Sequence, residues 1–253
     1  RYRLLGEVAR GGMGAVLRVW DGDLRRQLAM KVVLGRDAPS PGKALAVDPR
    51  VLDRFLEEAQ VTGQLDHPGI VPVHELGLDA AGRAYFTMRL VKGEDLSRIY
   101  EHVSTGRGGW TQLRALGVML KVCEAMSYAH AKGVLHRDLK PGNVMVGKFG
   151  EVYVMDWGLA RVLGREDQHD LRIRPESAGL TAIATDRQAS LAERPDSPLV
   201  TMEGQVVGTP SYMPPEKAMG QISRLGPHSD GYAAGATLYH LLSGRMPFAH
   251  ARA

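Results

Sequence analysis

The sequence predicts an α+β fold of two lobes, a β-rich N-terminal lobe with one helix and an α-rich C-terminal lobe. The first observation is a set of short strand-like runs within residues 1–88, interrupted by a single helical segment. The second is the change to helical periodicity that begins at Glu94. The third is composition, because 253 residues that are 44% hydrophobic and 24% charged can bury a sizeable core.

Five strands and one helix are expected in the N-terminal lobe. A glycine turn separates the first two strand-like runs, and a loop rich in Gly, Pro and Asp precedes the helical segment. The strands are RYRLLGEVA (1–9), GAVLRVWD (14–21), QLAMKVVL (27–34), IVPVHELGLD (70–79) and RAYFTMRLV (83–91), and the helix is VLDRFLEEAQVTGQL (51–65). We expect a connector at 89–93 to lead into the second lobe, 94–253, with a ligand cleft between the lobes.

The second lobe is expected to be mostly helical. TQLRALGVMLKVCEAMSYAHAKG (111–133) predicts a long helix ended by Gly133, and EVYVMDWGLA (151–160) predicts a strand and a tight turn. Residues 164–205 lack periodicity and predict a long mobile loop. YAAGATLYHLLSG (232–244) predicts a second helix that is apolar on most sides and is therefore expected to be buried.

Composition and charge favour a cytoplasmic location. The formal net charge of +4 comes without a basic run, so no nucleic-acid partner is expected. The one cysteine, Cys123, excludes an internal disulfide and fits a reducing compartment. No signal peptide is found, and the longest apolar stretch, 115–134, is interrupted by charges, so no membrane segment is expected. The absent initiator Met indicates a piece of a longer polypeptide, which leaves room for an anchor elsewhere.

A glycine-rich hairpin tip, ARGGMGAV (9–16), lies between the first two expected strands. Small residues let backbone N–H groups approach phosphate oxygens, although an ordinary tight turn has the same composition. Lys31 follows in the apolar strand LAMK, where it either reaches the surface or holds phosphates. Glu58 on the expected helix is its partner, with Glu57 as the alternative because helical phase separates the two poorly.

The run VLHRDLKPGNVMV (134–146) predicts a rigid loop between two buried apolar anchors. Asp138 is placed to accept a proton from an attacking hydroxyl, and Lys140 to neutralise charge on a transferring phosphoryl group. Asn143, and Asp156 in VMDWGLAR, offer hard oxygen ligands to a cation such as Mg²⁺. We interpret His136 as a packed structural residue rather than a base.

Five motifs stand in one order along nearly the whole chain: the glycine-rich strip, LAMK, HRDLKPGN, DWG and PPE. With them the chain resembles serine/threonine protein kinases, and GGMG and VMDWGLAR are similar to the bacterial subgroup. The resemblance implies the two-lobed protein kinase fold over residues 1–253, without its last C-terminal helices. It also implies transfer of the γ-phosphoryl group of ATP to Ser or Thr of protein substrates, with Mg²⁺. An ATP-binding scaffold, a pseudokinase, is the alternative.

The resemblance also implies roles for individual residues. Asp138 is the catalytic base with Lys140 beside it, and Lys31, paired with Glu58, holds the phosphates. Asn143 and Asp156 bind the metal ions. The ATP site comprises Val8, Ala9, Arg10, Gly11, Gly12, Met13, Gly14, Ala15, Val16, Ala29, Lys31, Met88, Arg89, Val91 and Met145.

Four residues depart from the family pattern. Ala9 stands where the first glycine is usual, Trp157 replaces the usual Phe, and Pro214 replaces the usual Ala. Arg89 stands where an acidic residue is common, but the connector works through its backbone. Trp157 is expected to fill the same apolar position if its N–H finds an acceptor. None of the four removes a charged catalytic group.

The activation segment of the family corresponds to residues 156–216, which are rich in Ser and Thr. Thr201 is the expected phosphorylation site, and Arg137 resembles the arginine that pairs with such a phosphate and orders the loop. A polar loop that is never modified is the alternative. Autophosphorylation there would involve self-association of two copies.

Overall fold

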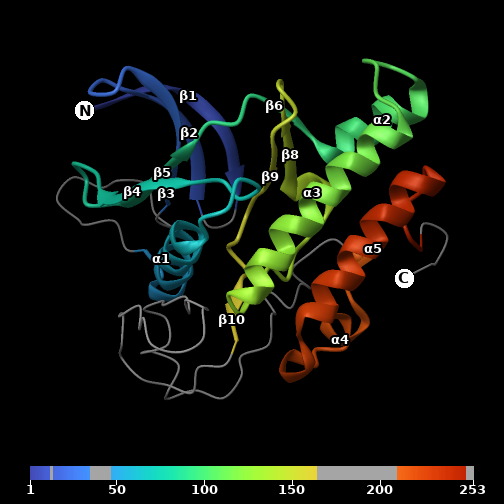
Figure 1. The fold of residues 1–253 in the computed structure, drawn as a ribbon. Coiled ribbons are helices and arrows are strands. Elements are labelled where there is room, and N and C mark those ends of the chain that lie inside the picture. Colours follow the sequence, from blue (N-terminus) through green and yellow to red (C-terminus); the bar gives the residue numbers. More distant parts are fainter. Residues whose placement is uncertain (12–13, 35–46, 164–209, 249–253) are drawn as a thin grey trace.

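A computed structural model of the chain describes residues 1–11, 14–34, 47–163 and 210–248. It has the α+β architecture that the sequence predicts, with a β-rich N-terminal sheet and a helical C-terminal part. In Figure 1 the sheet and α1 lie on one side of the molecule, and α2, α3, α4 and α5 lie on the other. The expected division at residues 89–93 falls between β5 and β6 and stays a prediction.

An antiparallel five-stranded sheet forms the N-terminal part, in the order β1-β2-β3-β5-β4. Its strands are β1 (Tyr2–Gly11), β2 (Gly14–Asp21), β3 (Arg26–Val33), β4 (Val73–Leu78) and β5 (Ala84–Arg89). All five strands that the sequence predicts are therefore confirmed, with bounds that differ by a few residues. The β1–β2 hairpin places the glycine-rich tip at one end of the sheet.

Side chains of β3 alternate between two apolar clusters, because successive residues of a strand face opposite sides of the sheet. Leu28, Met30 and Val32 join Val19 in a cluster on one face. Ala29 and Val33 join the cluster on the other face, which contains Phe55 of α1 and Phe86 of β5. Lys31 shares the face of Ala29 and Val33, so the alternation directs its ammonium toward α1.

Helix α1 (Pro49–Gln64) packs against β3 and β4 on the inner face of the sheet, which carries Ala29, Lys31 and Val33. Phe55 and Ala59 belong to the inner sheet cluster, and the ring of Phe55 lies 5.1 Å from that of Phe86. Val61, and Leu65 directly after the helix, belong to the core of the helical part. The helix therefore contributes to both cores.

Three helices form most of the C-terminal part, namely α2 (Leu96–Thr105), α3 (Gln112–Ala131) and α5 (Pro227–Ser243). Asp95 and Thr111 cap the N-termini of α2 and α3 by accepting hydrogen bonds from Arg98 N and Arg114 N. Buried residues of α3 recur every three or four positions: Ala115, Val118, Met119, Val122, Ala125, Met126 and Ala129. α3 and α5 lie side by side (Figure 1).

Short strands and short helices connect the three long helices. A three-stranded sheet contains β6 (Gly93–Asp95), β8 (Val144–Gly147) and β9 (Val152–Val154), and a two-stranded sheet pairs β7 (Val134–Leu135) with β10 (Arg161–Val162). The short helices are η1 (Pro141–Asn143), η4 (Pro210–Tyr212), α4 (Pro215–Ala218) and η5 (Ile222–Arg224). The β7/β10 pair was not predicted, because two-residue strands leave no periodic pattern.

The expectation that the helix at 232–244 is buried is only partly correct. Asp230, Ala233, Thr237 and Leu241 are buried, whereas the side chains of Tyr239 and Leu242 are about half exposed. Those two residues lie on the face of α5 that other elements of the described chain leave open. Apolar composition alone does not show which face of a helix is covered.

Several expectations concern residues outside the described ranges. Residues 35–46 of the expected loop at 35–49, the run 164–205, and the residues Gly12, Met13 and Thr201 all lie there. Among the helices that the structure describes, none has the length and apolar character needed to cross a bilayer.

Candidate active site

Lys31 of β3 and Glu58 of α1 form an ion pair on the inner face of the sheet. Lys31 Nζ lies 2.6 Å from both carboxylate oxygens of Glu58. The Lys31 side chain is 12% exposed and Glu58 is buried. Burial raises the pKa of Glu58, and the nearby Asp156 carboxylate adds to this effect, whereas the charge of Lys31 opposes it. The sequence left Glu57 and Glu58 as alternatives, and the structure selects Glu58.

A cavity of about 360 Å³ opens beside this ion pair. The glycine-rich hairpin covers it through Ala9, Gly11 and Gly14, and Val16 of β2 contributes an apolar wall. Lys31, Glu58 and Asp156 form a charged end. The remaining lining residues are Arg10, Thr62, Val71, Phe86, Met88, Met155 and Trp157. An apolar chamber with a cation at one end is suited to a planar ring that carries an anionic group.

The loop between β7 and β8 brings three polar side chains together. Lys140 Nζ donates to Asp138 Oδ2 at 2.7 Å. Asn143 Nδ2 donates to the same Oδ2 at 3.1 Å and to the main-chain oxygen of Asp138 at 2.8 Å. Two donors from the same loop thus hold the carboxylate of Asp138 in one orientation. A group that accepts a proton needs such a fixed orientation toward the hydroxyl that supplies the proton.

Asp156 lies at the charged end of the cavity, after β9. Its Oδ1 is 4.0 Å from Lys31 Nζ, and about half of its side chain is exposed. The backbone at Asp156 is left-handed, with φ 61°. A non-glycine residue holds this conformation only where its surroundings fix it, which is common at functional sites.

Main-chain contacts connect the Asp138 loop to the strand that precedes Asp156. Met155 N donates to Asn143 O at 2.8 Å, and Met155 O lies 2.9 Å from His136 Nε2. Because His136 Nδ1 accepts from Asp138 N at 3.2 Å, Nε2 carries the proton that Met155 O accepts. His136 is fully buried, with its ring against that of Trp157 at 4.7 Å. It is therefore a structural residue, as the sequence predicted.

Asp230 of α5 holds the start of the same loop. Its carboxylate accepts from His136 N and Arg137 N, both at 2.8 Å, and lies 2.9 Å from His130 Nε2. Burial by itself would raise the pKa of Asp230, but the hydrogen bond from His130 and the backbone N–H groups bring it below its usual value. Asp230 therefore stays ionised and ties α5 to the loop.

Asn143 and Asp156 offer oxygen donors of the kind that Mg²⁺ prefers. Both amide N–H contacts of Asn143 go to Asp138, so the amide oxygen of Asn143 is its remaining ligand atom. Asp156 supplies a half-exposed carboxylate at the cavity. One carboxylate and one amide oxygen are few for a closed protein site, but they suit a cation that also takes oxygens from water and phosphate. No cluster of three or more His, Cys, Asp or Glu side chains suited to a metal is found within the described part of the chain.

Seven of the thirteen predicted nucleotide-site residues that the structure describes line this cavity, and six do not. Met145 lies in β8, and Val8, Ala29 and Arg89 lie in β1, β3 and β5. Val91 follows β5, and none of these five is among the lining residues. Side chains alternate along β2, so the side chain of Ala15 lies on the face opposite to that of Val16 and points away from the cavity that Val16 lines. The roles assigned to these residues stay predictions.

Four cavity residues were not predicted from the sequence. Thr62 lies four residues after Glu58 on α1, and Phe86 lies two before Met88 on β5, so helix and strand spacing would have placed both beside predicted residues. The other two, Val71 and Met155, lie outside regular elements and had no such signal.

Trp157 also lines the cavity and replaces the Phe that is usual in the family. It is almost fully buried, and its Nε1 donates to Val154 O at 3.3 Å. The indole N–H thus has the acceptor that this substitution requires, and the ring fills the expected apolar position.

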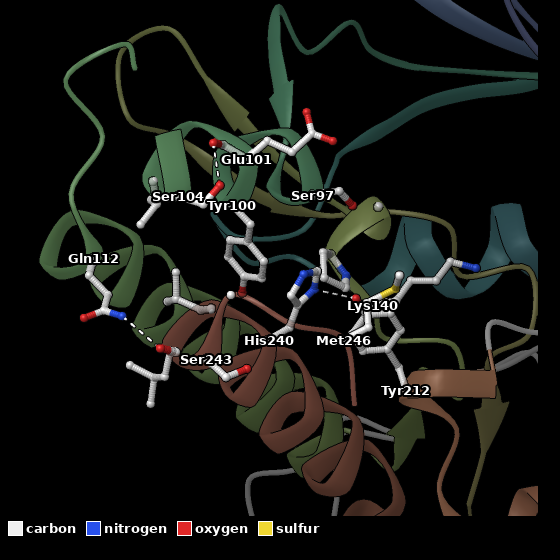
Figure 2. Close-up of a pocket in the computed structure, with 16 residues that line it drawn as sticks. Ser97, Tyr100, Glu101, Ser104, Gln112, Lys140, Tyr212, His240, Ser243 and Met246 are labelled. Atoms are coloured by element: carbon white, nitrogen blue, oxygen red, sulfur yellow. Dashed lines mark hydrogen bonds between the residues drawn. The ribbon is translucent and has the colours of Figure 1, made fainter. Parts of the chain in front are cut away.

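A second cavity, of about 800 Å³, lies in the helical part on the other side of Lys140. Figure 2 shows Tyr100 and Tyr212 on either side of His240, with the Tyr212 hydroxyl 2.7 Å from His240 Nδ1. Lys140 lines this cavity and also donates to Asp138, which is not itself among the lining residues. It is the larger of the two, but the charged groups gather in the first.

The chain belongs to the protein kinase family. The family model described as "Protein kinase domain" matches residues 2–253.

Curated relatives cover almost the whole chain. A serine/threonine-protein kinase PknD of Protochlamydia amoebophila is 36% identical over 98% of this chain and 23% of its own length. A PknD of Chlamydia muridarum is 33% identical over 98% of this chain and 25% of the relative. A serine/threonine-protein kinase PknA of Mycobacterium tuberculosis is 34% identical over 98% of this chain and 48% of the relative. The chain thus spans a quarter to a half of the length of these relatives.

Proposed function

We propose that this chain is the catalytic domain of a serine/threonine protein kinase of the bacterial subgroup. The observation that supports this most directly is the pairing of Lys31 with Glu58 at one end of a cavity that Asp156 also lines. Asp138, held by Lys140 and Asn143, adds the base. Its loop is joined through Asn143 O to the N–H of Met155, a residue that lines the same cavity. Relatives named as serine/threonine-protein kinases match over nearly the full chain.

Each charged residue has a defined task in this proposal. Asp138 accepts the proton of the attacking Ser or Thr hydroxyl, and the ammonium of Lys140 stabilises negative charge next to that oxygen. Lys31 orients the phosphates of ATP, and Glu58 keeps the Lys31 side chain extended along the cavity. The chain thereby supplies positioning and electrostatic stabilisation, which is most of what phosphoryl transfer requires.

ATP and Mg²⁺ fit the two ends of the first cavity. Val16, Met88 and Phe86 offer apolar walls to the adenine, and the strip around Gly11 and Gly14 covers the phosphates. The Asn143 amide oxygen and the Asp156 carboxylate would hold Mg²⁺. The cation would neutralise part of the phosphate charge.

A protein substrate fits the second cavity, because Lys140, which donates to the proposed base Asp138, is one of the residues that line it. Its walls carry hydroxyl, amide, imidazole and apolar side chains, a mixture suited to a peptide segment rather than to a small alcohol.

Phosphorylation at Thr201 is the proposed means of regulation. A phosphate adds about −1.5 to −2 charges and would pair with Arg137, which immediately precedes the base. Transfer between two copies would make the rate of autophosphorylation depend on protein concentration.

The test uses the full-length protein incubated with ATP and Mg²⁺, followed by mass spectrometry of phosphorylated sites. We expect Ser and Thr phosphorylation that Asp138→Asn lowers by a factor on the order of 10³ or more, because general-base catalysis alone contributes up to about 10⁴. ATP affinity and melting temperature should be retained in this variant. Equal labelling by the Asp138→Asn variant would contradict the assignment of the base, and ATP binding without transfer by the unaltered protein would indicate a pseudokinase.

A further inference from the structure

Lys217 of α4 is a buried lysine to which the proposed kinase function assigns no task. It is 7% exposed, and its Nζ donates to the main-chain oxygen of Arg137 at 2.7 Å. It also lines a narrow cavity together with Asp138, Lys140 and Tyr212. A charged side chain that is this deeply buried costs free energy unless its contacts compensate, so its place beside the base needs a reason.

The oxygen that Lys217 binds belongs to the peptide group that leads into Asp138. The N–H of the same peptide group donates to His136 Nδ1 at 3.2 Å. Lys217 and His136 therefore fix this peptide plane from its two opposite ends. The preceding peptide group is held as well, because Arg137 N donates to Asp230.

The backbone at Arg137 requires such restraint. Its φ is +67°, in the left-handed region that non-glycine residues rarely adopt. A residue keeps this conformation only where its surroundings over-determine it. Rotation of the 137–138 peptide plane would turn the Asp138 side chain away from Lys140 and Asn143.

Charges around Lys217 come from both sides of the loop. Asp138 and Asp230 are the nearby carboxylates, and Arg137 and Lys140 are the nearby cations. The positive charge of Lys217 is therefore near both Asp138 and Asp230. Among the ion pairs of the described residues, Asp138 pairs with Lys140 and Asp230 with His130, and neither pairs with Lys217. Its one direct contact is with the peptide oxygen.

We propose that Lys217 is a positioning residue for phosphoryl transfer: its ammonium fixes the Arg137–Asp138 peptide plane and so sets the direction of the Asp138 carboxylate. This inference rests on the proposed kinase function. It places part of the control of the base on α4, a helix that directly follows the 164–209 stretch and η4.

The test compares two substitutions in the full-length protein. Lys217→Met keeps the length of the side chain and removes the donor, and Lys217→Gln keeps a neutral N–H donor. For Lys217→Met we expect kcat to fall by a factor on the order of 10², since small misplacement of a reacting group has this effect. The KM for ATP and the affinity for an ATP analogue should be unchanged. Lys217→Gln should recover at least about a tenth of the native kcat.

Lys121→Met is a matched control. Lys121 also donates to a main-chain oxygen, that of Gly150 at 2.8 Å, but it is exposed on α3 and its acceptor lies outside the segment 134–140. Its substitution should leave kcat unchanged.

Amide hydrogen exchange gives a readout that does not depend on activity. In Lys217→Met, exchange should accelerate in the segment 134–140 and stay unchanged in α3. Native kcat in Lys217→Met, failure of Lys217→Gln to recover, or acceleration spread equally over α3 would each overturn the proposal. If the unaltered protein transferred no phosphoryl group, the proposed function would fall, and exchange would still decide whether Lys217 holds the loop.

Discussion

Lys31 is the residue at which the apolar pattern of the sheet is interrupted. Its neighbours on the same face, Ala29 and Val33, pack in the inner cluster, whereas Lys31 directs its ammonium to Glu58. Helical spacing explains why Glu58 rather than Glu57 is the partner. Glu58 lies three residues after Phe55 and four before Thr62, on the buried side of α1.

The buried pair leads to a prediction about stability. Lys31→Met should destabilise the fold by about 3 kcal/mol, because it leaves the Glu58 carboxylate buried without its counter-charge. The double variant Lys31→Met/Glu58→Met should regain most of this loss, since no charge remains to be desolvated. Urea unfolding of the native protein and both variants measures the difference. A single variant as stable as the native protein would show that Glu58 finds another partner.

At the scale of the element, replacing two glycines with alanine should change the stability of the protein in opposite directions. One glycine lies where β2 meets β3, and the other lies on the exposed side of α3. A Cβ at Gly14 would lie 2.2 Å from Val32 O and 3.1 Å from its carbonyl carbon, so Gly14→Ala must push the strands apart. Gly117 lies inside α3 on its exposed side, and a methyl group added there would meet no atom within 4 Å. Gly117→Ala should therefore stabilise the protein by about 0.5–1 kcal/mol.

Thermal unfolding of these two variants is the measurement. The melting temperature should fall for Gly14→Ala and rise for Gly117→Ala. Gly14→Ala should also weaken the binding of an ATP analogue, because Gly14 lines the first cavity. A rise for both variants would mean that the β2–β3 contact relaxes without cost.

The sequence predicted the long elements well and the short ones poorly. The runs that became β3 and α3 have strong periodic patterns, and both were placed within a few residues of their ends. The two-residue strands β7 and β10 depend on tertiary contacts that no local pattern records. In the candidate site, motifs identified Asp138 and Asp156, but Lys217 had no signal, since its role comes from the approach of α4 to a distant loop.

Helix α5 carries a group whose titration should affect stability. Burial lowers the pKa of His240, and its Nδ1 can accept the hydrogen bond from the Tyr212 hydroxyl only in the neutral form. In the unfolded chain the pKa is about 6.5. The unfolded state therefore binds more protons below this pH, so stability is fully present above about pH 6.5 and falls as the pH drops toward the lowered folded-state pKa.

Urea unfolding at pH 7.5 and pH 5.5 tests this prediction. His74 also has a pKa lowered by burial, so the native protein and a His240→Gln variant are compared rather than one curve alone. The native protein should lose more stability on acidification than His240→Gln, which cannot gain a proton. Equal losses in both would assign the effect to His74.

At the scale of the whole molecule, α1 joins the two hydrophobic cores. Phe55 packs with the sheet, and Val61 packs with Ile70 and the residues of α3 in the helical core. The ion pair with Lys31 lies between these two contacts on the same helix. The position of Glu58 thus depends on the packing of both parts, so a change in either core reaches the site through α1.

This arrangement predicts different consequences for two equally conservative core substitutions. Val61→Ala removes apolar volume where α1 meets the helical core, and Val19→Ala removes it from the cluster on the outer face of the sheet, away from α1. Both residues are buried, and each change should cost about 2 kcal/mol from lost burial of apolar surface. Only Val61→Ala should lower the protection from hydrogen exchange in both the sheet and the helical part.

Native-state hydrogen exchange followed by mass spectrometry separates the two outcomes. For Val61→Ala, protection should decrease in β3, α1 and α3. For Val19→Ala, the decrease should be confined to the sheet, and the affinity for an ATP analogue should change less than in Val61→Ala because α1 keeps its position. If protection decreased in the same segments in both variants, the two cores would unfold as one unit through contacts other than those of α1. Residues 90–92, between β5 and β6, would then be the next place to look for coupling between the site and the helical part.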